Sequence, residues 1–167
     1  MTTLRIAFRP ALSALAVSSL LLLTACASMQ ATQPVATTIA GKPELSTLSG
    51  LISKANLATT LNGAGSITVF APSNEAFKAV PAKTMDELAA NPARLTEVLT
   101  YHVLATKAMA QDVKDGPAKT LHGGNLALAK AGTFVTVEDA IVQTADIRAT
   151  NGVVHIVDRV LIPPVRK

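Results

Sequence analysis

The side chains best suited to chemistry are those of His102, His155 and Asp158, because imidazole and carboxylate groups bind metal ions and carry protons. A zinc site needs three or four such ligands that converge at about 2 Å from the ion. His155 and Asp158 are three residues apart on a predicted strand, residues 153–160, so their side chains point to opposite faces. His122 lies at a predicted turn and is expected to be solvent-exposed. We therefore expect no metal and no other cofactor.

Nucleophilic and phosphate chemistry are also poorly supported. The chain has no Gly-x-Ser-x-Gly nucleophile elbow. Gly63-Ala64-Gly65 is followed by a predicted strand and lacks the Lys-Ser/Thr pair of a phosphate-binding loop. The acidic pairs Asp86-Glu87 and Glu138-Asp139 fit a helix start and a turn better than an acid–base pair. We expect a protein that is not an enzyme; an activity lost on substitution of His102 or Asp158 would contradict this.

Cys26, the only cysteine, stands at the end of an apolar run near the N-terminus. A single cysteine cannot form an internal disulfide, so it needs another role in an exported chain. Together with the preceding Leu23-Thr24-Ala25, it resembles the lipobox of bacterial lipoproteins. The resemblance implies a thioether-linked diacylglycerol on Cys26, cleavage before it, and acylation of the new amine by a fatty acid such as palmitate. An ordinary signal peptide that leaves Cys26 free is the alternative.

The first 25 residues have the order of a secretory signal. Residues 1–10 contain Arg5 and Arg9 and no acid, residues 11–23 are mostly apolar, and small residues follow. This apolar core is shorter than the roughly 20 residues of a membrane-spanning helix. We predict a lipoprotein signal peptide over residues 1–25 and a lipid-anchored tether over residues 26–33. No Asp follows Cys26, which favours the outer membrane; a periplasmic and a surface-facing orientation both stay open.

The charge balance of the predicted mature chain is close to neutral. The chain has 15 Lys and Arg residues against 11 Asp and Glu residues, and the predicted signal removes Arg5 and Arg9. A net charge of about +2 remains, with acids and bases interspersed along the chain. Nucleic acid is therefore not an expected partner, and the membrane is expected to be contacted through the lipid on Cys26.

Helical signals dominate the first half of the remaining chain. Asn91-Pro92 predicts a helix start, because Asn caps well and Pro is tolerated at the first helical position. Residues 84–87 have the Thr-x-x-Glu form of a capping box, which predicts a second start at Thr84. Ser73 is expected to cap a helix over residues 74–80. Apolar residues recur at helical spacing at Leu45, Leu48, Leu51, Ile52, Leu57 and Leu61.

Strand signals dominate the second half. Asn151-Gly152 predicts a tight hairpin, because both residue types tolerate a positive φ. The mixture of helices and hairpin-connected strands predicts an α+β fold with antiparallel pairing. Segments rich in Val, Ile, Leu and Thr predict strands over residues 67–70, 125–129, 133–137, 140–144 and 153–160.

Three segments of the chain resemble the hallmark segments of the fasciclin domain family. They are TVFAPSNEAF (residues 68–77), YHVL (residues 101–104) and ATNGVVHIVDRVLIPP (residues 149–164), in the family's order and at about its spacing. Residues 35–52 are similar to the family's opening helices. The resemblance covers residues 34–164, which we predict to form one fasciclin domain. It implies a compact wedge with a β-sandwich-like core of antiparallel or mixed strands and several helices packed at one side.

The resemblance also implies a function. Fasciclin domains are associated with adhesion to cells, matrix or polysaccharide, and no catalysis is general to them. The family's Tyr-His region, here Tyr101 and His102, is discussed both as structural and as part of an adhesive surface. An acid near the final strand, here Asp158, is suspected of receptor contact; a salt-bridged strand end is the alternative for this residue.

The remaining residues of these segments have structural and functional interpretations. Asn74 either belongs to a strand–turn–helix corner or offers an exposed contact, and Asn151, Gly152 and His155 lie within the last segment. Aromatic residues, which favour tight binding, are few. We therefore expect a non-catalytic exported lipoprotein that mediates adhesion or envelope interactions, with a cell-surface protein or polysaccharide as partner. A periplasm-facing binding module for a small ligand or an envelope partner is the alternative.

Overall fold

The computed structural model describes residues 33–63 and 65–164. The chain divides into two units, Met1–Gln30 and Ala31–Lys167, and the fold concerns the second. The predicted signal peptide, Cys26 and the tether up to residue 32 lie outside the described residues. Among the described helices, none is long and apolar enough to cross a bilayer.

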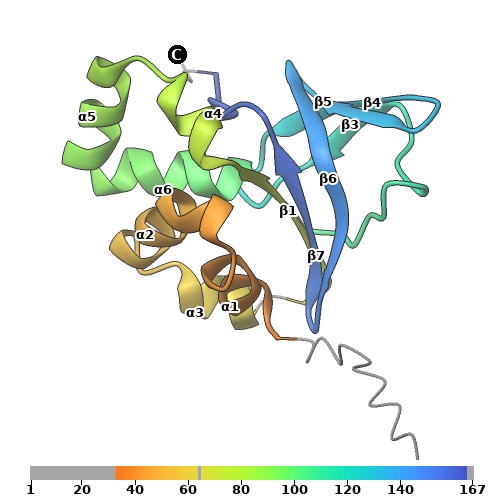
Figure 1. Ribbon diagram of the computed structural model, residues 1–167, viewed down its shortest axis with the longest axis horizontal. Helices are drawn as coiled ribbons and strands as arrows, with labels where there is room; N and C mark the ends of the chain where they lie inside the picture. Colours follow the sequence, from red (N-terminus) through yellow and green to blue (C-terminus); the bar gives the residue numbers. More distant parts are fainter. Residues whose placement is uncertain (1–32, 64, 165–167) are drawn as a thin grey trace, which may run out of the picture. The chain divides into compact units, whose positions relative to one another are not determined.

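Short helices make up most of the first half of this unit (Figure 1). The Ser73 hydroxyl accepts a hydrogen bond from the Ala76 N–H, and the Asn91 side chain accepts one from the Arg94 N–H, so both predicted caps are confirmed. The helices are α1 (Val35–Ala40), the 3-10 helix η1 (Pro43–Leu45), α2 (Ser46–Lys54), α3 (Ala58–Gly63), α4 (Asn74–Lys78), α5 (Ala82–Ala90) and α6 (Pro92–Tyr101).

The strands form one seven-stranded mixed sheet in the order β2-β1-β7-β6-β5-β4-β3. The α+β class is confirmed. The predicted antiparallel pairing holds for every pair except β1–β7, which is parallel. In Figure 1 the helices gather on one side of β1 and β7, and β3–β5 lie on the other. The strands are β1 (Ile67–Pro72), β2 (Val103–Leu104), β3 (Gly116–Lys119), β4 (Asn125–Ala131), β5 (Phe134–Val137), β6 (Ala140–Ala149) and β7 (Gly152–Val157).

The two end strands of this sheet meet each other. Leu104 at the end of β2 forms an antiparallel bridge with Thr120, the residue after β3. Next to it, the Leu121 N–H donates to the Val103 carbonyl at 2.8 Å. The sheet therefore curls until its first and last strands are in contact.

Strands β1 and β7 are buried at every position because they separate two apolar cores. Val69 of β1 and Val154 of β7 pack with the helices, whereas Phe70 of β1 and Val157 of β7 pack with β4 and β5. A strand buried on both faces needs a continuous apolar run, and each fully buried Val or Phe contributes roughly 1.5–3 kcal/mol. This explains why the first and last hallmark segments are nearly uninterrupted apolar sequences.

Some predicted boundaries were wrong. Helix α5 begins at Ala82 rather than Thr84, because the Pro81 carbonyl already accepts a hydrogen bond from the Met85 N–H. Strand β7 ends at Val157, short of the predicted residue 160. Strand β6 is longer than predicted, since two register shifts let it continue to Ala149.

Candidate functional site

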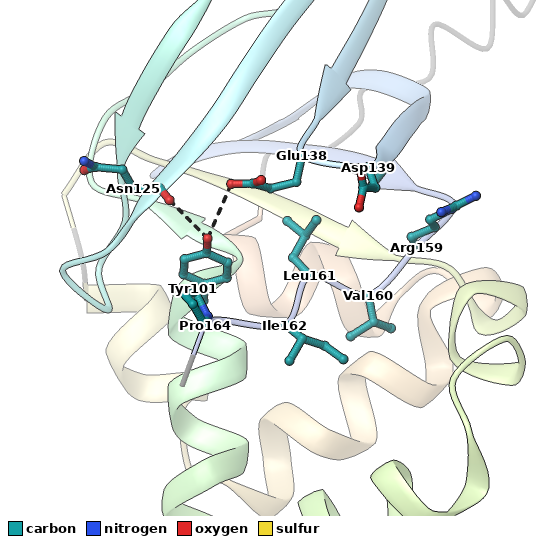
Figure 2. Close-up of a pocket in the computed structure, with 10 residues that line it drawn as sticks. Tyr101, Asn125, Glu138, Asp139, Arg159, Val160, Leu161, Ile162 and Pro164 are labelled. Carbon is teal, nitrogen blue, oxygen red and sulfur yellow. Dashed lines mark hydrogen bonds between the residues drawn. The ribbon is translucent and has the colours of Figure 1, made fainter. Parts of the chain in front are cut away.

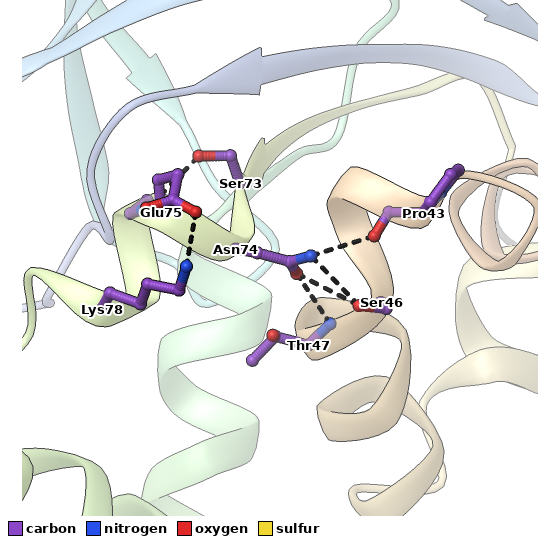
Figure 3. Close-up of polar contacts among 8 residues, drawn as sticks. Pro43, Ser46, Thr47, Ser73, Asn74, Glu75 and Lys78 are labelled. Carbon is purple, nitrogen blue, oxygen red and sulfur yellow. Dashed lines mark hydrogen bonds and ion pairs between the residues drawn. The ribbon is translucent and has the colours of Figure 1, made fainter.

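Asn74 bridges two helices rather than standing free. Its side-chain oxygen accepts from the Thr47 N–H at 3.0 Å, and its amide donates to the Pro43 carbonyl at 2.9 Å and to the Ser46 hydroxyl at 3.1 Å (Figure 3). The first turn of α2 leaves N–H groups without helical partners, and Asn74 caps that turn from α4. Asn74 is half-buried, so its polar atoms are engaged in packing α2 against α4.

Asn151 and Gly152 hold the turn between β6 and β7 against the opening helices. The Asn151 amide donates to the Leu61 carbonyl at 2.6 Å, and its side-chain oxygen accepts from the Val35 N–H at 2.9 Å. Neither residue has a positive φ, so the reason given for this hairpin was wrong. Gly152 is instead required by space, since a Cβ there would lie 2.3 Å from the Ile67 carbonyl oxygen.

His155 is buried and both of its ring nitrogens are engaged. Nε2 donates to the Ala108 carbonyl at 2.9 Å, and Nδ1 accepts from the Asp146 N–H at 3.2 Å, which fixes the neutral tautomer. The ring stacks on Phe70 with centroids 5.6 Å apart. Burial lowers the pKa of His155. Within the described residues, no group of three His, Cys, Asp or Glu side chains is placed to hold a metal ion.

Tyr101, at the end of α6, ties the helix to β4 and to the β5–β6 turn. Its hydroxyl donates to the Asn125 carbonyl at 3.0 Å and lies 3.4 Å from Glu138 Oε1 (Figure 2). The pKa of Tyr101 is raised by burial first and by the neighbouring Glu138 carboxylate second.

His122 packs edge-on against the Tyr101 ring and is half-buried, so its expected exposure was wrong.

His102 ties the same helix end to the C-terminal part of the domain. Nδ1 donates to the Val98 carbonyl at 2.7 Å, and Nε2 accepts from the Leu161 N–H at 2.9 Å. The side chain is 2% exposed, and this burial lowers the pKa of His102 to about 4. His102 is therefore neutral at pH 7 and spans α6 and Leu161.

Asp158 closes the β6–β7 ladder. Its carboxylate accepts from the Ile141 N–H at 2.7 Å, and its own N–H donates to the Ile141 carbonyl at 3.2 Å. Among the described residues Asp158 forms no ion pair, so a salt-bridged strand end was the wrong alternative. After Asp158 the chain leaves the sheet as residues 159–164, which we call the terminal segment.

A groove of about 610 Å³ lies between the terminal segment and the β5–β6 turn (Figure 2). Glu138 and Asp139 form one wall, the terminal segment forms the other, and Tyr101 lies at one end. Tyr101 contacts the first wall at Glu138, and His102 holds the second wall at Leu161. The adjacent residues Tyr101 and His102 thus position both walls of the groove.

The structure assembles this groove mostly from residues for which the sequence indicates no functional role, including Glu138-Asp139, which the sequence predicts to be a turn. Asn125, Glu138 and the terminal segment join Tyr101, whereas Asn74, Asn151 and His155 do not line it. Pro163-Pro164 after an apolar run was the available signal, since such a pair keeps a chain extended outside a sheet. A second hollow of about 360 Å³, lined in part by α4 and Pro81, also borders the terminal segment.

Comparisons with known proteins agree with one another. The Fasciclin domain model matches residues 43–163. The chain is 40% identical over 127 residues to protein sll1483 of Synechocystis, covering 75% of this chain and 71% of that protein. It is 40% identical over 136 residues to the immunogenic protein MPB70 of Mycobacterium bovis, covering 78% of this chain and 69% of that protein.

Two further proteins are similar. The cell surface glycolipoprotein MPB83 of Mycobacterium bovis is 40% identical over 139 residues, covering 80% of this chain and 62% of that protein. Among solved structures, the FAS1 domain pair of the insect cell adhesion molecule fasciclin I aligns with a TM-score of 0.62 at 15% identity. That alignment covers 78% of this chain and 51% of the other.

Proposed function

Because the chain belongs to the fasciclin domain family, we propose that it is a non-catalytic exported lipoprotein that works by adhesion or by contacts within the cell envelope. Cys26 carries the lipid, and the fasciclin domain makes the contact through the groove beside Tyr101 and His102. The groove is the observation on which the proposal rests, because the family's Tyr-His pair positions both of its walls.

The names of related proteins support this proposal. One relative is called a cell surface glycolipoprotein, and the solved domain pair comes from a cell adhesion molecule. The apolar residues 11–23, which end in the segment Leu23-Thr24-Ala25-Cys26, support export and lipid attachment. Several acyl chains anchor a protein durably, since each buried CH₂ contributes about 0.8 kcal/mol. Many anchored copies then multiply weak contacts.

Replacing Cys26 by alanine is expected to release the protein from membranes, because the thioether bond to diacylglycerol can no longer form. Membranes are pelleted from cells expressing either version, and the protein is followed by blotting. As a matched control, Ser28→Ala changes a nearby small residue and keeps the protein in the pellet. A Cys26→Ala variant that still pellets with membranes contradicts lipid attachment.

Protease treatment of intact cells tests the adhesive role. Cleavage of the protein on intact cells is expected, because an adhesin must face outward. Protection until the envelope is opened would contradict adhesion to external surfaces and favour the periplasm-facing binding module. The groove also suits that second function, since a hollow of about 610 Å³ is in the range of small-ligand sites.

A further inference from the structure

On the premise of that function, we propose that the partner bound in the groove is an extended peptide. The peptide pairs with the backbone of the terminal segment as an added strand, and it places a lysine or arginine side chain beside Glu138 and Asp139. Four features of the described residues carry this inference: the conformation of the terminal segment, its backbone groups, the hollows beside it, and the charges of the groove.

After a bend at Asp158 and Arg159, the rest of the terminal segment is stiff and strand-like (Figure 2). Asp158 ends the ladder with β6, and Pro163 and Pro164 each fix their φ angle. Ile162 precedes a proline and is therefore restricted to extended conformations. In Figure 2 the Leu161 side chain points opposite to those of Val160 and Ile162, as side chains alternate along a strand.

One backbone edge of the terminal segment is available for pairing. The Leu161 N–H points to His102 Nε2, so the N–H groups of Val160 and Ile162 face the other way in an extended chain. Within residues 33–63 and 65–164, no hydrogen-bond acceptor faces these two N–H groups. A strand-like segment with unpaired backbone groups is the template that extended peptides bind by strand addition.

Two hollows border the terminal segment and can receive side chains. Tyr101 lines the groove of about 610 Å³, and α4 lines part of the hollow of about 360 Å³. Ile162 borders both and is 49% exposed. Alternate side chains of a bound strand point to opposite faces, so one added strand can use both hollows.

The charges of the groove favour a cationic side chain. Glu138 Oε1 accepts from the Ala127 N–H at 2.9 Å and lies 3.4 Å from the Tyr101 hydroxyl, whereas Oε2 has no partner among the described residues. The Asp139 carboxylate likewise has no ion pair in this part of the chain. Arg159 is the single cationic residue among those that line the groove. With two carboxylates and one guanidinium, the groove carries a net negative charge, which attracts a positively charged group.

A peptide fits these features better than a polysaccharide does. Tyr101 is the aromatic residue among those that line the groove, and it is 4% exposed. Its ring face therefore cannot stack on a sugar. The backbone N–H groups of Val160 and Ile162, in contrast, match the carbonyl spacing of a second strand.

Selection from a random heptapeptide library displayed on phage tests the inference. The full chain in detergent micelles is immobilised as the target, and selected peptides are synthesised for titration. Enriched peptides are expected to hold a lysine or arginine among β-branched residues. The double variant Glu138→Gln/Asp139→Asn is expected to weaken their binding at least tenfold. The matched double variant Asp86→Asn/Glu87→Gln removes the same charge from the exposed face of α5 and leaves binding unchanged.

Amide hydrogen exchange provides the second readout. A bound peptide is expected to slow exchange at Val160 and Ile162, because their N–H groups become paired. No enrichment over bare micelles, equal binding to Glu138→Gln/Asp139→Asn, or unchanged exchange at both residues overturns the inference. If cells carrying that double variant lose adhesion although no peptide is enriched, the partner is not an extended peptide and the proposed function stands. Protection from protease on intact cells contradicts adhesion whichever peptides bind.

Discussion

Replacing His102 by alanine is expected to lower the free energy of unfolding by about 3–5 kcal/mol. The change leaves the buried Leu161 N–H without its acceptor, takes a donor from the Val98 carbonyl, and opens a cavity beside α6. Urea unfolding followed by far-UV circular dichroism measures the effect. Lys83→Ala, on the exposed surface of α5, is the control and should stay within about 0.5 kcal/mol of the original protein. Unchanged stability with lost adhesion would contradict the structural role and assign His102 to the contact itself.

The same residue predicts how stability depends on pH. The pKa of His102 is lowered from 6.5 to about 4 in the folded protein, so between these values the unfolded chain binds more protons. The stability from neutral His102 is complete above pH 6.5, and about 3 kcal/mol of it is lost as the pH falls to 4. Burial also lowers the pKa of His155, so this residue too loses stabilising effect as the pH falls. Unfolding measured at pH 7, 5.5 and 4 should show a shallower dependence in His102→Ala; an equal slope would contradict the role of His102.

Replacing Gly152 by alanine is expected to lower the free energy of unfolding by about 3 kcal/mol. The new Cβ would lie 2.3 Å from the Ile67 carbonyl oxygen, a backbone atom that cannot move aside alone. Ile67 and Gly152 are the first pair of the parallel β1–β7 ladder, so relief requires a shift of the strands that separate the two cores. The expected result is a large drop in the urea midpoint.

Gly50→Ala is the matched control for this substitution. Gly50 lies inside α2, and apart from the neighbouring backbone of that helix no atom lies within 4 Å of a Cβ there. Alanine is the better helix former by roughly 1 kcal/mol, so this variant should be slightly more stable than the original protein. If Gly152→Ala unfolds at the same urea concentration as the original protein, the close approach of β1 and β7 is not a constraint on the fold.

The elements with strong local signals were predictable from the sequence. Ser73 and Asn91 cap helices through bonds within three residues, so their roles are visible in the sequence alone. The apolar segments that became β1 and β7 were also recognisable. Strand β3 was not predicted, because Gly116-Pro117-Ala118-Lys119 contains no residue with a strand preference and forms a strand only by pairing with β4.

The candidate site was harder to predict because it depends on distant residues. Asn151 reaches Val35 across 116 positions, and His102 reaches Leu161 across 59. No local pattern reveals such bonds. For Asp158 the sequence offered a charged neighbour, Arg159, whereas the fold supplies the nearby Ile141 N–H instead. The hallmark segments thus located the site, and the tertiary contacts decided the role of each residue.

The contact between the two end strands of the sheet affects how the domain behaves when many copies are close together. Open sheet edges are templates for aggregation, because their unpaired backbone groups can join those of another molecule. Here the edge strand β2 has two residues and β3 has four, one of which is Pro117 with no N–H to offer. Where these strands meet, Leu104 and Thr120 pair with each other instead of with a neighbour. At these two edge strands, the closure of the sheet therefore protects crowded copies of the domain from edge-to-edge pairing.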